Sequence, residues 1–287
     1  MATGVEINRS NITLPPDVSR EILAKTQTDS AVMKLARQIN LPGRGAAIQA
    51  VTSEPTAAWV DETDEKPVSR PGLATSVMQP YKLAVIVPFS NEFRRDADFL
   101  YEALVDRLPL ALATKFDNTI VGTTAPGSNF TVLGSAQAQE IGTNAYAGLV
   151  AAEQDIAANG GDLNGFALAP AGKGALLAST DENGRPLFVN SAAEGAIPYI
   201  FGAPVVMSKG VADANNDIVG IAGDWTQAMY GTVEGVKIDI SDQATLTDGD
   251  DTINLFQRNM FAVRAEIELG FVADADCFNL LKVTSES

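Results

Sequence analysis

The sequence DETDEKPVSRPG occupies residues 61–72, at the centre of an unusual stretch that runs from Gln49 to Leu83. On each side of this polar centre lies an arm of roughly a dozen residues, which as extended chain at about 3.3 Å per residue would be about 40 Å long. A compact domain of this size has a radius of gyration of only about 19 Å, and isolated hairpins are marginally stable in water. The stretch is therefore expected either to be disordered or to pack against another molecule.

A single large aromatic residue, Trp59, lies on the first arm beside the polar centre. A lone aromatic ring on a polar arm favours a partner surface, because its apolar area is large and its partners on the arm are few. The alternative interpretation is that Trp59 packs inside its own domain.

The residues after this stretch predict a strand and then a long helix. The sequence YKLAVIVPFS at residues 81–90 is typical of a strand, which we expect to end at Pro88 because proline donates no ladder hydrogen bond. From Asp96 to Val121, large apolar residues recur every four positions, the spacing of a helix. Pro109 lies inside this pattern and is expected to kink the helix or reset its register.

The residues before the stretch predict two short helices. Pro15 opens the first helical pattern, and residues 28–30 can cap a second one that carries Ile39 and stops at Leu41.

The rest of the chain alternates loops, helices and strands, so the class is mixed α+β. Residues 122–143 are rich in Gly, Ser and Thr and predict a loop. The apolar patterns predict helices at 146–158 and around 176–177, and strands at 166–170, 205–207, 218–221, 236–240, 256–269, 271–272 and 278–283.

The composition excludes several classes of protein. The chain has 287 residues, 20 Lys+Arg against 36 Asp+Glu, a net charge of −16, no histidine and one cysteine, Cys277. Without histidine there is no Ser-His-Asp triad and no imidazole metal site, and one cysteine forms no intrachain disulfide.

The acidity disfavours general binding to nucleic acid. Residues 1–6 lack the features of a signal peptide and no apolar run reaches the length of a membrane span, which predicts a soluble chain made inside the cell.

A search for chemistry predicts no catalytic, cofactor-binding or metal-binding residue. The sequence AGKG at residues 171–174 lacks the first glycine and the Ser/Thr of a phosphate loop, and DGDD at residues 248–251 lacks the ligand spacing of a calcium loop, so that a solvated acidic turn is favoured over a weak cation site. Cys277 has acidic neighbours that would raise its pKa, as expected for a buried structural thiol. Catalysis by a pair of carboxylates stays open, although no pair is marked out.

Several separate stretches, in their order and spacing, resemble the major capsid proteins of tailed bacteriophages, which have the Hong Kong ninety-seven type capsid fold. The first stretch comprises residues 58–60, the acidic run after them, Ser69, and residues 81–84 and 90–92; the second is the long helix 96–121. The third comprises residues 181–187, 201–205 and 223–225. The fourth comprises residues 259–266 with Gly270, Phe271, Asp274 and Phe278.

The resemblance implies a division of the chain into an N-terminal arm, an extended β-hairpin loop, a peripheral domain with a long spine helix, and a compact axial domain. The corresponding residues are 1–48 for the arm, 49–83 for the loop, 84–131 and 236–287 for the peripheral domain, and 132–235 for the axial domain.

For function, the resemblance implies self-assembly into an icosahedral shell that encloses phage double-stranded DNA without sequence-specific binding. The partners would be other copies in pentamers and hexamers, with a separate scaffolding protein, since the chain has no room for the scaffolding segment of some members, and a portal. The protein would be in the virion capsid after assembly in the bacterial host cytoplasm, with no membrane. The residues expected at contacts between subunits are Trp59, Asp61, Glu62, Asp64, Glu65, Lys66, Arg70, Arg264 and Glu266.

Some members cross-link their shells through a lysine and an asparagine. Lys66 lies in the corresponding loop, but no asparagine partner or assisting glutamate is marked out, so cross-linking is disfavoured. Three alternatives remain: a shell of the encapsulin type that holds enzymes, a hydrolase with paired carboxylates in a deep acidic cleft, and a β-rich binding module whose residues 49–83 recognise a partner.

Overall fold

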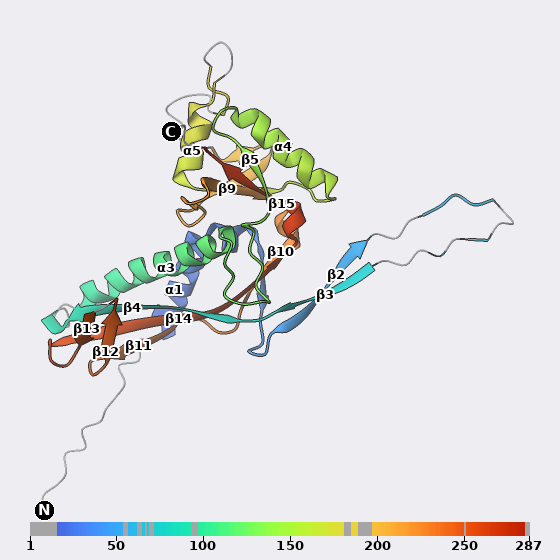
Figure 1. The fold of residues 1–287 in the computed structure, drawn as a ribbon. Coiled ribbons are helices and arrows are strands. Elements are labelled where there is room, and N and C mark those ends of the chain that lie inside the picture. Colours follow the sequence, from blue (N-terminus) through green and yellow to red (C-terminus); the bar gives the residue numbers. More distant parts are fainter. Residues whose placement is uncertain are drawn as a thin grey trace, which may run out of the picture.

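The described residues contain both helices and strands, with the α-helices between Pro16 and Ala178 and mostly strands after them, which confirms the predicted α+β class (Figure 1). The structure, a computed structural model, describes residues 16–53, 57–61, 65–66, 68, 72–92, 97–180, 185–188, 197–249 and 251–284.

The longest strand, β14 (Met260–Ala273), organises a five-stranded sheet. On one side it pairs antiparallel with β4 (Tyr81–Ser90); on the other it pairs with β11 (Lys237–Ser241) and then with β10 (Ala228–Thr232), which pairs parallel with β1 (Arg37–Asn40). The two faces of β14 differ in burial, because Phe261, Val263 and Ile267 on one face are buried whereas Arg264 on the other is exposed.

The prediction that the strand at 81–90 ends at Pro88 is wrong. β4 continues to Ser90, and Pro88 pairs with Ala262 of β14. β4 pairs with β14 and with no other strand that the structure describes, so it is an edge strand, and proline is tolerated there because one row of backbone groups is left without ladder bonds.

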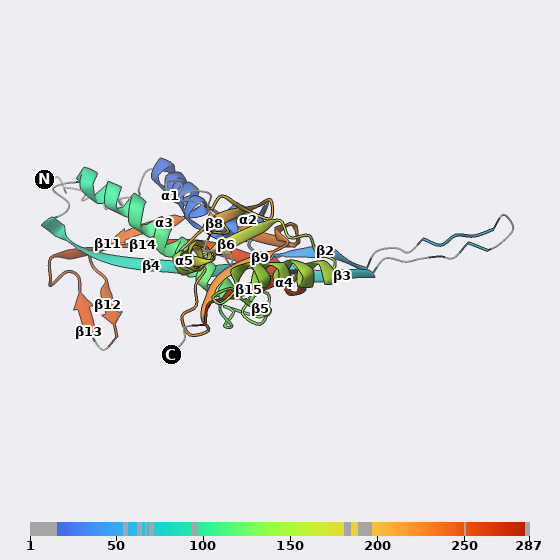
Figure 2. The same ribbon diagram turned by 90° about the horizontal axis from the view of Figure 1, so that it is seen from above.

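Helix α3 (Ala97–Val121) lies along one face of this sheet, beside α1 (Pro16–Asp29) (Figure 2). α3 confirms the predicted long helix, and its 25 residues correspond to a length of about 38 Å at 1.5 Å per residue. Pro109 lies inside this single helix and does not divide it. The buried side chains between helix and sheet include Leu108, Leu112, Phe116, Ile120, Val263 and Phe271.

The predicted second helix is shorter than expected. α2 (Ala31–Leu35) begins at the N-cap Ser30, whose hydroxyl accepts a hydrogen bond from the Met33 N–H. Ile39, which we expected in this helix, lies in β1 instead, where it pairs with Gly231 of β10.

A six-stranded sheet forms the upper part of the molecule in Figure 1. Its order is β5 (Gln137–Glu140), β15 (Phe278–Lys282), β9 (Ile218–Gly223), β6 (Gly165–Leu168), β8 (Ala203–Met207) and β7 (Tyr199–Ile200), with α4 (Ala145–Ala158) and α5 (Pro170–Ala178) beside it. β6 is buried on both faces, because Phe166 and Leu168 join the core with α4 and α5 whereas Ala167 joins the core with α3.

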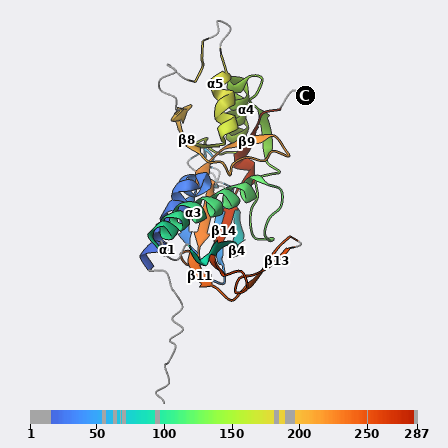
Figure 3. The same ribbon diagram turned by 90° about the vertical axis from the view of Figure 1, so that its left-hand side faces the viewer.

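The proposed division into domains remains a prediction, but two strands cross its boundaries. β10 comes from residues 132–235 and lies in the five-stranded sheet, whereas β15 comes from residues 236–287 and lies in the six-stranded sheet. The shared core between the two sheets contains Trp225 and Phe278, whose rings meet edge to face with their centroids 5.2 Å apart. Figure 3 shows α4, α5 and β9 above the part of the molecule that contains α1, α3 and β14.

Two hairpins extend from this body. β2 (Ala46–Ser53) pairs antiparallel with β3 (Gly72–Met78) in the long projecting hairpin, and β12 (Thr245–Asp248) pairs with β13 (Asp251–Asn254) in a shorter one (Figure 1). Met78 anchors the base of the long hairpin and is fully buried. The predicted acidic turn at 248–251 joins these two short strands, since β12 ends at Asp248 and β13 begins at Asp251. Of the described residues in this turn, Gly249 is exposed with φ +60°, and Asp251 is exposed as well.

Candidate interaction surfaces

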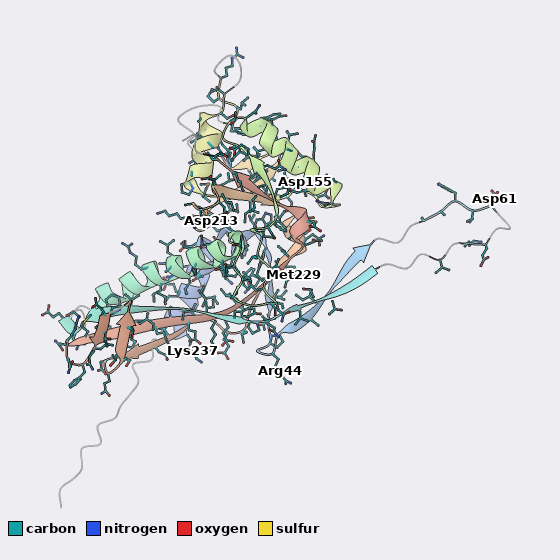
Figure 4. All side chains as sticks on the ribbon, viewed as in Figure 1. Arg44, Asp61, Asp155, Asp213, Met229 and Lys237 are labelled. Carbon is teal, nitrogen blue, oxygen red and sulfur yellow. The ribbon has the colours of Figure 1, made fainter. Side chains whose placement is uncertain are left out.

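The projecting hairpin carries a fully exposed aromatic side chain. Trp59 has a relative exposure of 104%, and the neighbouring Val60 and Val68 are exposed as well. The alternative that Trp59 packs inside its own domain is therefore wrong. Figure 4 places Asp61 at the far end of the hairpin, away from every other labelled residue of the body.

The predicted contact residues fall in two separate places. Asp61, Glu65 and Lys66 are exposed on the hairpin with Trp59, whereas Arg264 and Glu266 lie on β14 in the body. The remaining three predicted residues, Glu62, Asp64 and Arg70, lie outside the described residues. That these residues contact another subunit stays a prediction.

The charged face of β14 is paired within the chain. The Arg264 guanidinium donates to Asp239 of β11 at 2.5 Å, and the Lys82 ammonium of β4 lies 2.9 Å from Glu266. A third carboxylate, that of Glu268, lies 3.4 Å from the same ammonium. These contacts lower the pKa of Glu266 and raise the pKa of Lys82. Because Lys82, Arg264 and Asp239 are about half exposed or more, such pairs contribute little stability and mainly fix the charge pattern of this face.

A buried carboxylate, Asp117 of α3, links three segments that are distant in sequence. It accepts hydrogen bonds from the hydroxyls of Ser30 at 2.5 Å and Ser208 at 2.7 Å, and from the backbone N–H groups of Ala31 at 2.9 Å and Val32 at 3.4 Å. Burial raises the pKa of Asp117 above its ordinary value despite these donors. Its role is to hold the start of α2 and the segment after β8 against α3. Nothing in the sequence around Asp117 distinguishes it from the other acidic residues.

A second carboxylate, Asp224, holds the turn between β9 and β10. Burial would raise its pKa, but hydrogen bonds from Thr226, Asp162 N–H and Asn164 bring the pKa below the ordinary value. Cys277 lies in the same region, and burial followed by the nearby carboxylates raises its pKa to about 11. The thiol is thus buried and protonated near neutral pH, as predicted for a structural cysteine.

The upper part of the molecule has a hollow of about 780 Å³ between the start of α4 and one side of α5, which it follows to the end of that helix. Its described lining consists mostly of small or neutral side chains and contains no carboxylate, so it provides no acidic cleft for the hydrolase alternative. Gly172 of the AGKG sequence lies in α5, where an added Cβ would meet the backbone oxygen of Val219 at 2.7 Å. This glycine permits close packing of helix on strand, which accounts for it without a phosphate.

Among the described residues, no three His, Cys, Asp or Glu side chains gather into a possible metal site. In that same part of the chain, we find no helix with the length and apolar character needed to cross a bilayer.

Solved structures define the class of fold. The structure is similar to one from Gordonia phage Cozz (TM-score 0.71, 21% identity, 90% of this chain and 87% of the other) and to one from Mycobacterium phage Bobi (TM-score 0.70, 18% identity, 100% and 96%). It is also similar to the capsid of an empty GTA particle (TM-score 0.60, 16% identity, 90% of each chain). The fold is thus the Hong Kong ninety-seven type capsid fold, as the resemblance implied.

Sequence comparisons define the family. Residues 10–283 match the model of the phage capsid family. The chain is 30% identical to the probable major capsid protein gp17 of Mycobacterium phage L5, over 92% of this chain and 87% of that protein. It is 23% identical to the major capsid protein of Staphylococcus phage 80alpha, over 93% of this chain and 83% of that protein.

The chain therefore belongs to the phage capsid family, and it is a major capsid protein, a structural component of the virion shell. These relatives are phage proteins, which favours a phage capsid over the encapsulin, hydrolase and binding-module alternatives.

Proposed function

We propose that copies of this chain assemble through heterologous contacts, in pentamers and hexamers, into an icosahedral shell that encloses double-stranded DNA. The projecting hairpin is the observation that carries this proposal. An arm with a fully exposed Trp59, extending away from its own body, has no partner surface in the part of the subunit that the structure describes. A contact between two different surfaces of identical chains repeats from copy to copy and closes by symmetry.

The charged residues of the hairpin would orient this contact. Asp61 and Glu65, together with Glu62 and Asp64, would meet basic side chains of the neighbouring copy, which favours one orientation more than it adds affinity. On β14, Arg264 and Glu266 would present their paired charges to a neighbour, and Lys66 and Arg70 would lie near the acidic residues of the same contact.

The net charge of −16 supports enclosure of DNA without tight or sequence-specific binding, because an acidic inner wall repels phosphate. We infer a purely structural role without catalysis. The division into arm, hairpin loop, peripheral domain and axial domain belongs to this proposal. So do a separate scaffolding protein and a portal as partners, and assembly in the host cytoplasm.

The test is negative-stain microscopy and light scattering of the purified chain, alone and after co-expression with a candidate scaffolding protein. The expected result is closed particles of uniform diameter. Only monomers under every assembly condition would overturn the proposal. A packaged enzyme in place of a genome in particles from the natural source would favour the encapsulin alternative.

A further inference from the structure

A pocket of about 220 Å³ lies on the body between β4, α3 and the loop that follows α3. Three aromatic rings line it, those of Tyr81, Phe116 and Phe130, and apolar side chains of Leu83 and Leu269 complete the wall. The pocket is therefore lined mainly by apolar groups and is open to solvent on the surface of a highly charged protein.

The walls of this pocket are held in place by packing and hydrogen bonding. Phe130 meets Tyr81 edge to face at 6.1 Å and Phe116 edge to face at 6.2 Å. The Tyr81 hydroxyl accepts a hydrogen bond from the backbone N–H of Asn129 at 3.2 Å, which ties the loop to β4. At Gly127 an added Cβ would collide with the Tyr81 ring, so only glycine permits the loop to approach this closely. A preformed apolar pocket binds a ring without the cost of ordering its walls.

Two lysines lie at the rim of the pocket, and one of them has no acidic partner among the described residues. Lys82 and Lys115 both line it, from β4 and α3. The Lys82 ammonium is shared with Glu266 and Glu268, whereas Lys115 is exposed and forms no ion pair with any residue that the structure describes. Lys82 is therefore already compensated by two carboxylates, whereas Lys115, unpaired beside an apolar pocket, favours a ligand that joins an aromatic ring to an acidic group.

The chain itself presents such a group. Trp59 is fully exposed, and the exposed acids Asp61 and Glu65 lie close to it in sequence. The hairpin runs away from the body, and Figures 1 and 4 place its far end well away from β4 and α3. Trp59 therefore cannot enter the pocket of its own subunit.

We propose that the pocket receives the indole of Trp59 from a second copy of the chain, with the acidic residues Asp61 and Glu65 of that copy on the side of Lys115. A cavity of about 150 Å³ holds a benzene ring, so about 220 Å³ leaves room for an indole. Lysine ammonium groups at the rim also attract the face of the ring. The contact joins two different surfaces. A pair of copies joined in this way still has one free hairpin, on one copy, and one free pocket, on the other, so the contact propagates. This inference rests on the proposed assembly.

The direct test is a cross-link in particles that keep Trp59. Ala57 is exposed and lies two residues from Trp59, on the same side of an extended chain, and Thr119 lines the pocket. We expect particles of the Ala57→Cys, Thr119→Cys variant, treated with a short bismaleimide, to give a ladder of dimers and higher oligomers on a denaturing gel. The control is Ala57→Cys with Thr247→Cys, whose second cysteine lies on β12 outside the pocket, and it should give no ladder. The natural Cys277 is buried and should not react.

A second test measures assembly. Trp59→Ala, which removes the ring, and Thr119→Phe, which fills the pocket, should each lower the yield of particles by about tenfold or more, as expected for a central contact residue. Phe256→Ala removes another strongly exposed ring and should leave the yield unchanged. Particles that form normally with Trp59→Ala and show no 57–119 cross-link would overturn the inference and leave the proposed function intact. Failure of the unaltered chain to form particles under every condition would overturn both.

Discussion

Asp117 is the one acidic side chain in the described core whose pKa burial raises above the ordinary range, and this gives the fold a defined pH dependence. In the unfolded chain the pKa of an aspartate is about 3.9. The folded chain therefore holds this proton more tightly, so the stability from protonated Asp117 is full below the unfolded pKa and is lost as the pH rises through the folded pKa.

Replacement of Asp117 by asparagine should remove this dependence, since the amide does not titrate. We expect the free energy of unfolding of the unaltered chain, relative to that of Asp117→Asn, to fall as the pH rises from 4 to 7. Urea denaturation of both proteins as unassembled subunits measures the difference. Asp251→Asn, at an exposed position of β13, is the matched control. A difference that stays constant or grows with pH would contradict the assignment.

Gly223 makes a close approach of backbone and ring possible at the junction of the two sheets. It ends β9 opposite Phe278, and an added Cβ would collide with the Phe278 ring, which also packs on Trp225. We expect Gly223→Ala to lower the free energy of unfolding by about 1–3 kcal/mol, the usual cost of overpacking a core. Gly174→Ala is the control, because it lies in α5 with nothing within 4 Å of the added Cβ, and it should stabilise by up to about 1 kcal/mol. Thermal unfolding of both variants measures the difference, and Gly223→Ala should have the lower melting temperature. Equal melting temperatures would contradict the predicted overpacking at Gly223.

The outer part of the projecting hairpin should contribute little to the stability of the folded subunit. Among its described side chains, Met78 at the base is the buried large apolar one, and the described residues from Ala57 to Asp61 are exposed. Replacing residues 54–71 by an Asn-Gly turn, which suits a two-residue hairpin, should therefore leave the melting temperature of the subunit nearly unchanged and abolish particle formation. Circular dichroism and sedimentation velocity measure the two effects. Normal particles from the shortened chain would contradict the role of the hairpin, and a large loss of stability would contradict its independence.

Elements with a strong local pattern were predictable, and those that depend on distant pairing were not. α3 matches its four-residue apolar repeat, and β14 its alternation. β1 was missed because Arg37–Asn40 has one large apolar residue, and its strand character comes from pairing with β10, almost 200 positions later. β5, with the sequence QAQE, was taken as loop for the same reason, since its partner β15 lies at the other end of the chain.

The same distinction between local pattern and distant pairing decides which residues of the candidate surfaces could be predicted from the sequence. Trp59 was recognisable because its isolation on a polar arm is visible in the sequence itself. The aromatic pocket was not, because Tyr81, Phe116 and Phe130 come from a strand, a helix and a loop, and each fits the pattern of an ordinary core residue. Arg264 and Glu266 were correctly placed on one face of β14, but their partners Asp239 and Lys82 depend on strand register.

The whole subunit carries a charge of −16, which sets how it should behave toward DNA. Proteins that bind DNA non-specifically do so with Kd values of about 10⁻⁴–10⁻⁶ M, through cations that displace counterions, and their affinity falls with salt. A net acidic surface repels phosphate instead. We therefore expect the unassembled chain to bind a 30-base-pair duplex more weakly than about 10⁻⁴ M at physiological salt, as measured by fluorescence anisotropy.

The sign of the salt dependence separates repulsion from weak attraction. Lowering the ionic strength to about 0.01 M extends the screening length to about 30 Å, so repulsion should grow and any residual binding should weaken further. A protein that attracted DNA through locally unpaired basic side chains, such as Lys115, would bind more tightly under the same change. Assembled particles should follow the subunit, and release of their DNA on opening should need no added salt. Micromolar binding that strengthens as salt is removed would show that the shell holds its DNA by attraction and would contradict enclosure by an acidic wall.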